Sequence, residues 1–202
     1  CLATENWQTS LTALFRNQHF DPYQVVASVS TQAAILRKFP VPFIQAKQIE
    51  QVVAFEAEQY IQTIPIEEVV LDYHILKTED SSTRVLVAAL PRVIVQNAIA
   101  QIEACEIYPS GIDLDISGLL YMTQTVPLPE NDGGVILLDV RNDTCNVLVL
   151  FAGRIEEARA VRINANPEAA TDLRATTALA MPLFRQEGMR RTEFITLGAK
   201  AQ

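Results

Sequence analysis

The chain has 202 residues, of which 49% are apolar and 20% are charged, a balance typical of a globular domain. The formal net charge is −8, and no basic stripe with interleaved aromatic residues occurs, so binding to nucleic acid or to an anionic membrane surface is not expected. No stretch approaches the ~20 consecutive apolar residues of a membrane-spanning helix.

The cysteines and histidines form no metal-binding motif. Cys105 and Cys145 lie in apolar runs, so we expect them to be buried and reduced, as in cytosolic proteins. The only histidines are His19 and His74, and no CxxC pair or His/Cys cluster occurs. This pattern excludes the common zinc sites.

The first predicted elements are a helix and a strand. Apolar residues at helical spacing predict an amphipathic helix over residues 5–18. Because this predicted helix begins close to Cys1, we expect the sequence to be a piece of a longer protein. The Val-rich run 23–30 predicts a strand that is buried on both faces.

Residues 33–106 predict a compact α/β unit. We expect Pro40 and Pro42 to end the pairing of its first strand, because proline lacks a backbone N–H. The predicted elements are a strand over 33–42, a helix over 44–61, strands over 69–76 and 84–90, and a helix over 91–106. This order is most of a ferredoxin-like unit, in which two helices cover one face of an antiparallel sheet.

The second half of the chain predicts a short helix, a linker and a strand-rich region. Two prolines and two glycines make the loop 125–134 the best internal boundary. The predicted elements are a helix over 114–124, strands over 135–140, 145–151 and 155–162, a helix over 164–188 that Pro182 kinks or ends, and a final short strand from Glu193.

Four phrases, in this order, resemble the type IV pilus assembly protein PilM family. They are "ILRKFPVP", "IPIEEVVLDYHIL", "YPSGIDLD" and "VILLDVRNDTCNVLVLFAGRIEEARAVRI". More distantly, the chain resembles the cytoplasmic domain of type II secretion proteins of the GspL kind and the cell-division protein FtsA. These relatives have actin-like folds, so the resemblance implies an α/β protein of the actin-like (ribonuclease H-like) class.

The resemblance also implies a division of the chain. Residues 1–32 and 107–202 would form the actin-like part, with a boundary at 125–134, and residues 33–106 an inserted ferredoxin-like (SHS2-type) subdomain. After "ARAVRI" the family has paired glycines and a long second lobe, whereas this sequence continues "NANPEAATDLRATTALAMPLF". We therefore expect the second actin-like lobe to be reduced or absent.

In the resembling family, a hairpin that reads aspartate, any residue, glycine contacts nucleotide phosphate. Glycine lets backbone N–H groups approach the phosphate oxygens. Here the glycine position is Arg141, so the nucleotide-binding candidates Asp139, Arg141 and Thr144 are expected to be vestigial. An arginine can itself bind phosphate, and Asp139 has the alternative role of capping the turn. We expect no ATPase activity, no bound ATP or Mg²⁺ and no other metal.

Asp113 and Asp115 form a second acidic feature, in "GIDLD". Paired carboxylates can serve general acid–base chemistry, but only within a cleft. The alternative is that one of them caps the N-terminus of the helix over 114–124.

The resemblance implies a non-catalytic scaffold of a type IV pilus-like complex, cytoplasmic and peripheral to the inner membrane. It would bind the N-terminal tail of a PilN-like membrane protein in a groove between the insert and the first actin-like subdomain. Mapped onto this chain, the groove draws on "ILRKFPVP" and the start of "IYPSGID". Arg37 and Lys38 could meet an acidic tail, and Phe39 and Phe43 could supply apolar contacts or pack in the core.

Two other interpretations stay open from the sequence. One is an actin-like ATP-binding protein whose missing parts lie outside this sequence. The other is a GspL-like component of type II secretion. Further pilus or secretion components, or a second copy of the chain, are additional candidate partners.

Overall fold

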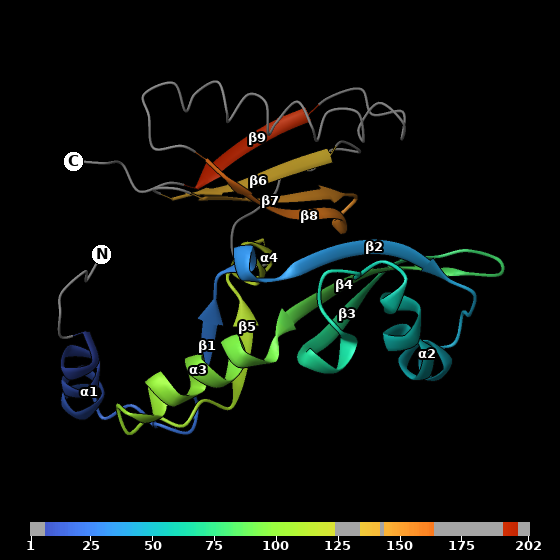
Figure 1. Cartoon of the computed structure of the whole chain (residues 1–202). Coiled ribbons are helices and arrows are strands. Elements are labelled where there is room, and N and C mark those ends of the chain that lie inside the picture. The colour runs from blue at the N-terminus through green and yellow to red at the C-terminus, as the bar shows by residue number, and fades with distance from the viewer. Residues whose placement is uncertain (1–6, 124–133, 142–143, 164–191, 198–202) are drawn as a thin grey trace.

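The computed structural model describes residues 7–123, 134–141, 144–163 and 192–197. It contains a parallel strand pair, a three-stranded antiparallel sheet and a four-stranded mixed sheet. The three-stranded sheet lies between helix α2 (Ala46–Glu58) and the four-stranded sheet (Figure 1). The helix predicted over 164–188 and the loop up to residue 133 lie outside the described residues. In the described part of the chain, no helix is long and apolar enough to cross a membrane.

The N-terminal region consists of one helix and one short strand. Helix α1 (Trp7–Gln18) confirms the predicted helix. Strand β1 (Val26–Val29) pairs in parallel with β5 (Gly111–Leu114) and with no other described strand. No residue of β1 is fully buried and Val26 is 66% exposed, so the prediction of a strand buried on both faces is wrong. A Val-rich run is buried on both faces only where other elements cover both.

The predicted element order of residues 33–106 is confirmed. The elements are β2 (Ile35–Val41), α2, β3 (Val69–Thr78), β4 (Thr83–Pro91) and α3 (Arg92–Glu103). The sheet order is β2-β4-β3, with both pairings antiparallel. Pro40 does not end the pairing, which continues to Val41 opposite Thr83. An edge strand such as β2 tolerates a proline, because the missing N–H need not belong to the ladder.

One helix, rather than the two predicted, fills the core of this insert. Helix α2 buries Ile49, Val53 and Ala57 against the alternate residues of β4 that face it, among them Val85 and Val87. Helix α3 has no buried residue. It continues from the end of β4 toward the β1–β5 pair (Figure 1).

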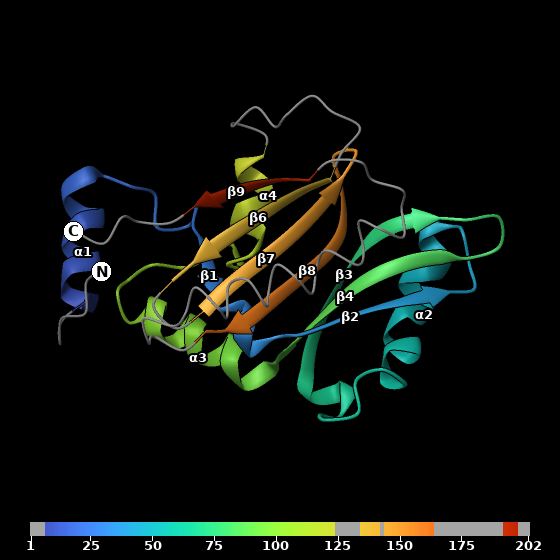
Figure 2. The same cartoon turned by 90° about the horizontal axis from the view of Figure 1, so that it is seen from above.

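The opposite face of the three-stranded sheet packs against the four-stranded sheet. The four-stranded sheet has the order β8-β7-β6-β9, built from β6 (Gly134–Val140), β7 (Thr144–Phe151), β8 (Arg154–Arg162) and β9 (Thr192–Leu197). Leu76 and Leu86 of the insert share a buried cluster with Leu137 and Leu148 of this sheet. Helix α4 (Ser117–Met122) adds Leu119 to the same cluster. Figure 2, from above, shows the four strands lying beside one another over α4.

The turn between β7 and β8 generates a stability prediction. Both of its residues have positive φ, 47° at Ala152 and 74° at Gly153, as in a type I′ turn, which favours Asn-Gly. An alanine in this conformation costs roughly 1 kcal/mol, a penalty that asparagine reduces. Ala152→Asn should raise the free energy of unfolding by about 0.5 kcal/mol in urea titrations, whereas Ala152→Val should lower it. A less stable Ala152→Asn variant would contradict this turn geometry.

Candidate functional site

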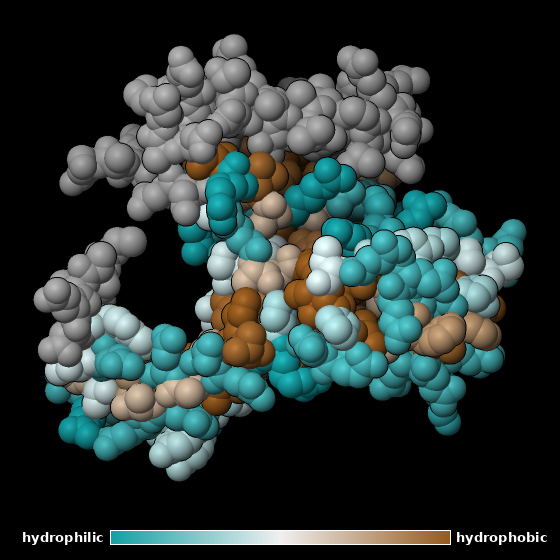
Figure 3. All heavy atoms as spheres, in the orientation of Figure 1, coloured by the Kyte–Doolittle hydropathy of each residue, from teal (hydrophilic) through white to brown (hydrophobic). Residues whose placement is uncertain are grey.

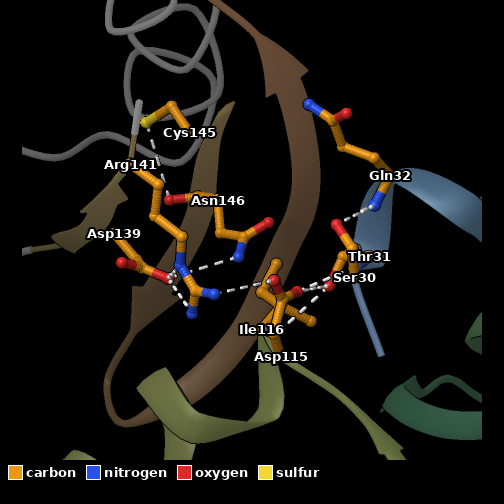
Figure 4. Close-up of polar contacts among 9 residues, drawn as sticks. All are labelled: Ser30, Thr31, Gln32, Asp115, Ile116, Asp139, Arg141, Cys145 and Asn146. Atoms are coloured by element: carbon orange, nitrogen blue, oxygen red, sulfur yellow. Dashed lines mark hydrogen bonds and ion pairs between the residues drawn. The ribbon is translucent and has the colours of Figure 1, made fainter. Parts of the chain in front are cut away.

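A buried polar contact joins the end of β1 to the end of β5. Asp115, directly after β5, accepts hydrogen bonds from the backbone N–H (2.8 Å) and the hydroxyl of Thr31. Thr31 begins the short 3₁₀ helix Thr31–Ala33 and is only 1% exposed. Its hydroxyl oxygen in turn accepts the backbone N–H of Ile116 at 3.1 Å. One threonine side chain thus serves both a carboxylate and a backbone donor (Figure 4).

Arg141 extends this contact to the four-stranded sheet. Its Nε donates to Asp139 Oδ2 at 2.9 Å, and its Nη1 lies 3.6 Å from Asp115 Oδ2. Figure 4 shows the guanidinium between the two carboxylates. The hydrogen bond to Asp139, with the charges of both aspartates, raises the pKa of Arg141, although burial opposes this. We call Thr31, Asp115, Asp139 and Arg141 the ion-pair network.

The structure brings the predicted nucleotide-binding residues together, but they bind one another. Asp139 lies within β6, opposite Asn146 of β7, and accepts the Nδ2 of that residue at 3.4 Å. Among the described residues its carboxylate contacts Arg141 and Asn146, and the turn that it was expected to cap includes residues 142–143, which lie outside the described residues. Thr144 contributes its backbone carbonyl, which accepts the N–H of Arg141 at 2.8 Å.

These residues do not fit a magnesium-bound nucleotide. A phosphate-binding hairpin needs free backbone N–H groups, whereas the N–H of Arg141 is used by Thr144. The Arg141 side chain is paired with two carboxylates, so its own positive charge is already compensated. Within the described ranges, no group of three or more His, Cys, Asp or Glu residues is placed to hold a metal ion.

The two aspartates of "GIDLD" do not act as a pair. Asp113 accepts the N–H of Leu114 and the hydroxyl of Ser117, each at 2.7 Å, while Asp115 faces Thr31. No side chain caps the N-terminus of α4, so the predicted capping role is wrong. The reason is that β5 pairs with β1 as far as Leu114, which makes the helix start later than predicted.

The cysteine prediction is confirmed for the two cysteines in the described ranges. Cys105 and Cys145 are both free and buried. Burial, and to a lesser extent the charge of Asp139, raises the pKa of the Cys145 thiol to about 11. Cys145 is therefore protonated at neutral pH and is a poor nucleophile.

An apolar groove of about 530 Å³ lies between the insert and the β1–β5 corner. Figure 3 shows apolar residues gathered at the centre of this face. Two carboxylates and one imidazole, those of Asp72, Asp113 and His74, also line it. Its main apolar lining residues are Leu36, Leu86, Leu90, Val95, Ile112 and Leu120. Of the two segments expected to form the groove, "ILRKFPVP" contributes Leu36. Asp72 and His74, which share one face of β3 by strand alternation, were not predicted to line it.

The four predicted partner-binding residues lie elsewhere. Phe39 is 1% exposed, and its ring stacks on Tyr60 with centroids 4.4 Å apart. Phe43 is half-buried and packs against the same core, so both phenylalanines take the core-packing role. Arg37 and Lys38 line a different groove, between β2 and β8.

The ion-pair network generates a prediction about Thr31. Thr31→Val keeps the side-chain shape but leaves Asp115 and the Ile116 N–H each without one hydrogen bond, which should cost about 2 kcal/mol of unfolding free energy. Thr63→Val, at an exposed loop position, is the matched control and should change stability little. Chemical denaturation measures both. Equal effects of the two substitutions would contradict the role assigned to Thr31.

Solved structures with the same fold come from pilus and secretion systems. The structure described as "PilM-PilN type IV pilus biogenesis complex" is 20% identical, with a TM-score of 0.79, over 95% of this chain and 67% of that chain. The cytoplasmic domain of EpsL, from the type II secretion system of Vibrio cholerae, is 17% identical, with a TM-score of 0.55, over 96% of this chain and 69% of that chain.

A third structure names the fold. A Bacteroides thetaiotaomicron protein of unknown function with an actin-like ATPase fold is 15% identical, with a TM-score of 0.53, over 96% of this chain and 68% of that chain. The fold is therefore actin-like, as the sequence predicts. No curated protein matches the sequence.

The sequence profile of one family matches most of the chain. This family is described as "Type IV pilus assembly protein PilM", and its match covers residues 3–159, which include the insert and most of the β6–β8 region. The chain belongs to the PilM family of type IV pilus assembly proteins.

Proposed function

We propose that this chain is a scaffold subunit of a type IV pilus-like complex and binds the N-terminal tail of a PilN-like membrane protein. Such binding would hold it on the cytoplasmic side of the inner membrane. The observation that carries the proposal is the apolar groove between the insert and the β1–β5 corner. The similarity to the structure described as a PilM-PilN complex supports the same class of partner.

The lining of the apolar groove indicates the chemistry of the tail. Leucine, isoleucine and valine side chains provide a surface for apolar anchors. Asp72 is exposed and carries a negative charge beside these residues, which favours a basic residue in the tail. This differs from the acidic tail expected from the sequence, because Arg37 and Lys38 do not line the apolar groove.

A substitution within the groove tests this assignment. Ala88 lines the groove and is half-buried, so Ala88→Phe places a ring where the tail would lie. We expect it to weaken binding at least tenfold, about 1.4 kcal/mol. The measurement is fluorescence polarisation with a labelled peptide from the N-terminus of the PilN-like protein encoded in the same genome.

Ala54→Phe is the matched control, because Ala54 is exposed on α2 and does not line the groove. It should leave the affinity unchanged, and both variants should retain the thermal unfolding midpoint of the parent. Unchanged binding by a folded Ala88→Phe protein would show that the tail binds elsewhere.

We also propose that the chain acts without binding or hydrolysing ATP. The support is that the N–H of Arg141 donates to the Thr144 carbonyl and its guanidinium lies within the ion-pair network. Titration with fluorescent ATP and Mg²⁺ should therefore give no saturable binding. Micromolar binding that is lost in Asp139→Ala would overturn the proposal and favour an actin-like ATP-binding protein.

A further inference from the structure

A second groove, which we call the basic groove, lies between β2 and β8 and has a volume of about 640 Å³. It shares only Leu36 and Ala158 with the apolar groove. Its polar lining residues are Thr31, Gln32, Arg37, Lys38, Glu157 and Arg159. It is thus a separate surface, and its lining is more polar than that of the apolar groove.

The charge of the basic groove is opposite to that of the whole chain. Three cations and one carboxylate line it, whereas the chain has a net charge of −8. Glu157 is shared, with one oxygen 3.2 Å from Lys38 Nζ and the other 3.5 Å from Arg159 Nε. One carboxylate therefore serves two cations, which leaves a local excess of positive charge.

Arg37 differs from the other two cations of the basic groove, Lys38 and Arg159, which both pair with Glu157. Its side chain is exposed, and its guanidinium donates to two backbone carbonyls, those of Tyr60 at 3.2 Å and Leu36 at 2.9 Å. No carboxylate in the described part of the chain forms an ion pair with it. These two carbonyl contacts hold the guanidinium in place without neutralising its charge.

Two further features indicate a ligand with an extended backbone. Strands β2 and β8 are both edge strands of their sheets as described, and edge strands offer backbone groups to an added strand. The Nε2 of Gln32 is buried and has no hydrogen-bond partner. A buried donor without a partner costs free energy, and a ligand carbonyl can remove that cost if the half-buried Gln32 side chain turns into the groove that it lines.

We propose that the basic groove binds an extended acidic peptide segment of a partner protein. Its carboxylates pair with Arg37 and with the cations that share Glu157, its backbone pairs with an edge strand, and one of its carbonyls accepts from Gln32. The positive charge favours an acidic ligand, and the edge strands favour a peptide over a compact anion. This proposal does not rest on the tail binding proposed for the apolar groove, although the two grooves share Leu36 and Ala158.

The test uses the whole chain and two labelled heptapeptides, one alternating glutamate with valine and one alternating lysine with valine. The glutamate peptide should bind in fluorescence polarisation, more weakly as salt increases, and the lysine peptide should not. Arg37→Gln should weaken binding at least tenfold. Lys47→Gln, which removes the same charge from an exposed position on α2 outside the groove, should weaken it less than twofold.

Two results would overturn the proposal. One is equal binding of both peptides or equal effects of the two charge substitutions. The other is Arg37-dependent binding of inorganic phosphate without binding of the glutamate peptide, which would assign the groove to a small anion. Binding of the PilN-like tail, measured separately, should be unaffected by Arg37→Gln.

Gln32→Leu separates a ligand contact from a structural role. Because this substitution removes a buried donor without a partner, the thermal unfolding midpoint should stay the same or rise, while the glutamate peptide should bind several-fold more weakly. A lower midpoint with unchanged peptide affinity would show that Gln32 serves the fold and not the ligand.

Discussion

The arrangement of the described elements depends on the hydrogen bonds and the ion pair of the Asp115 carboxylate. The side chain of Asp115 is only 10% exposed. Its partners come from two distant parts of the sequence, because Thr31 precedes it by 84 residues and Arg141 follows it on another sheet. Removing water from a charge is costly unless polar partners replace that water. These contacts therefore fix the β1–β5 pair and the four-stranded sheet in one arrangement. Thr31 and β8 contribute to the basic groove, and β5 contributes to the apolar groove.

A position that serves nucleotide chemistry in the resembling family has a structural role here. Arg141 supplies permanently the positive charge between Asp139 and Asp115, so the two sheets are joined without a ligand. Such a joint suits the scaffold role proposed above, because a scaffold's binding surfaces should keep nearly one shape. The apolar core of leucines from the insert, α4 and the four-stranded sheet supports the same rigidity.

Local sequence patterns predicted the helices and strands of this fold well. They predicted less well which side chains are buried and which distant residues they contact. The order of strands and helices in residues 33–106 and the strands of the β6–β8 region follow from periodicity and turn residues. The exposure of Val26, the burial of Phe39 and the pairing of Arg141 with Asp115 depend on which distant segments meet. The resemblance led to the groove that Leu36 lines. Strand alternation places Asp72 and His74 on one face, but it does not show that this face lines a groove, and Gln32 had no identifiable pattern.

Leu36 and Ala158 line both grooves, and this has a thermodynamic consequence. Any shift of β2 or β8 that improves the fit of one ligand also changes a wall of the other site. The two binding equilibria are then linked, and linkage is reciprocal, since each ligand must alter the affinity for the other by the same factor. In such a scaffold, binding of one partner would change the affinity for the other through these two side chains, with no change of fold.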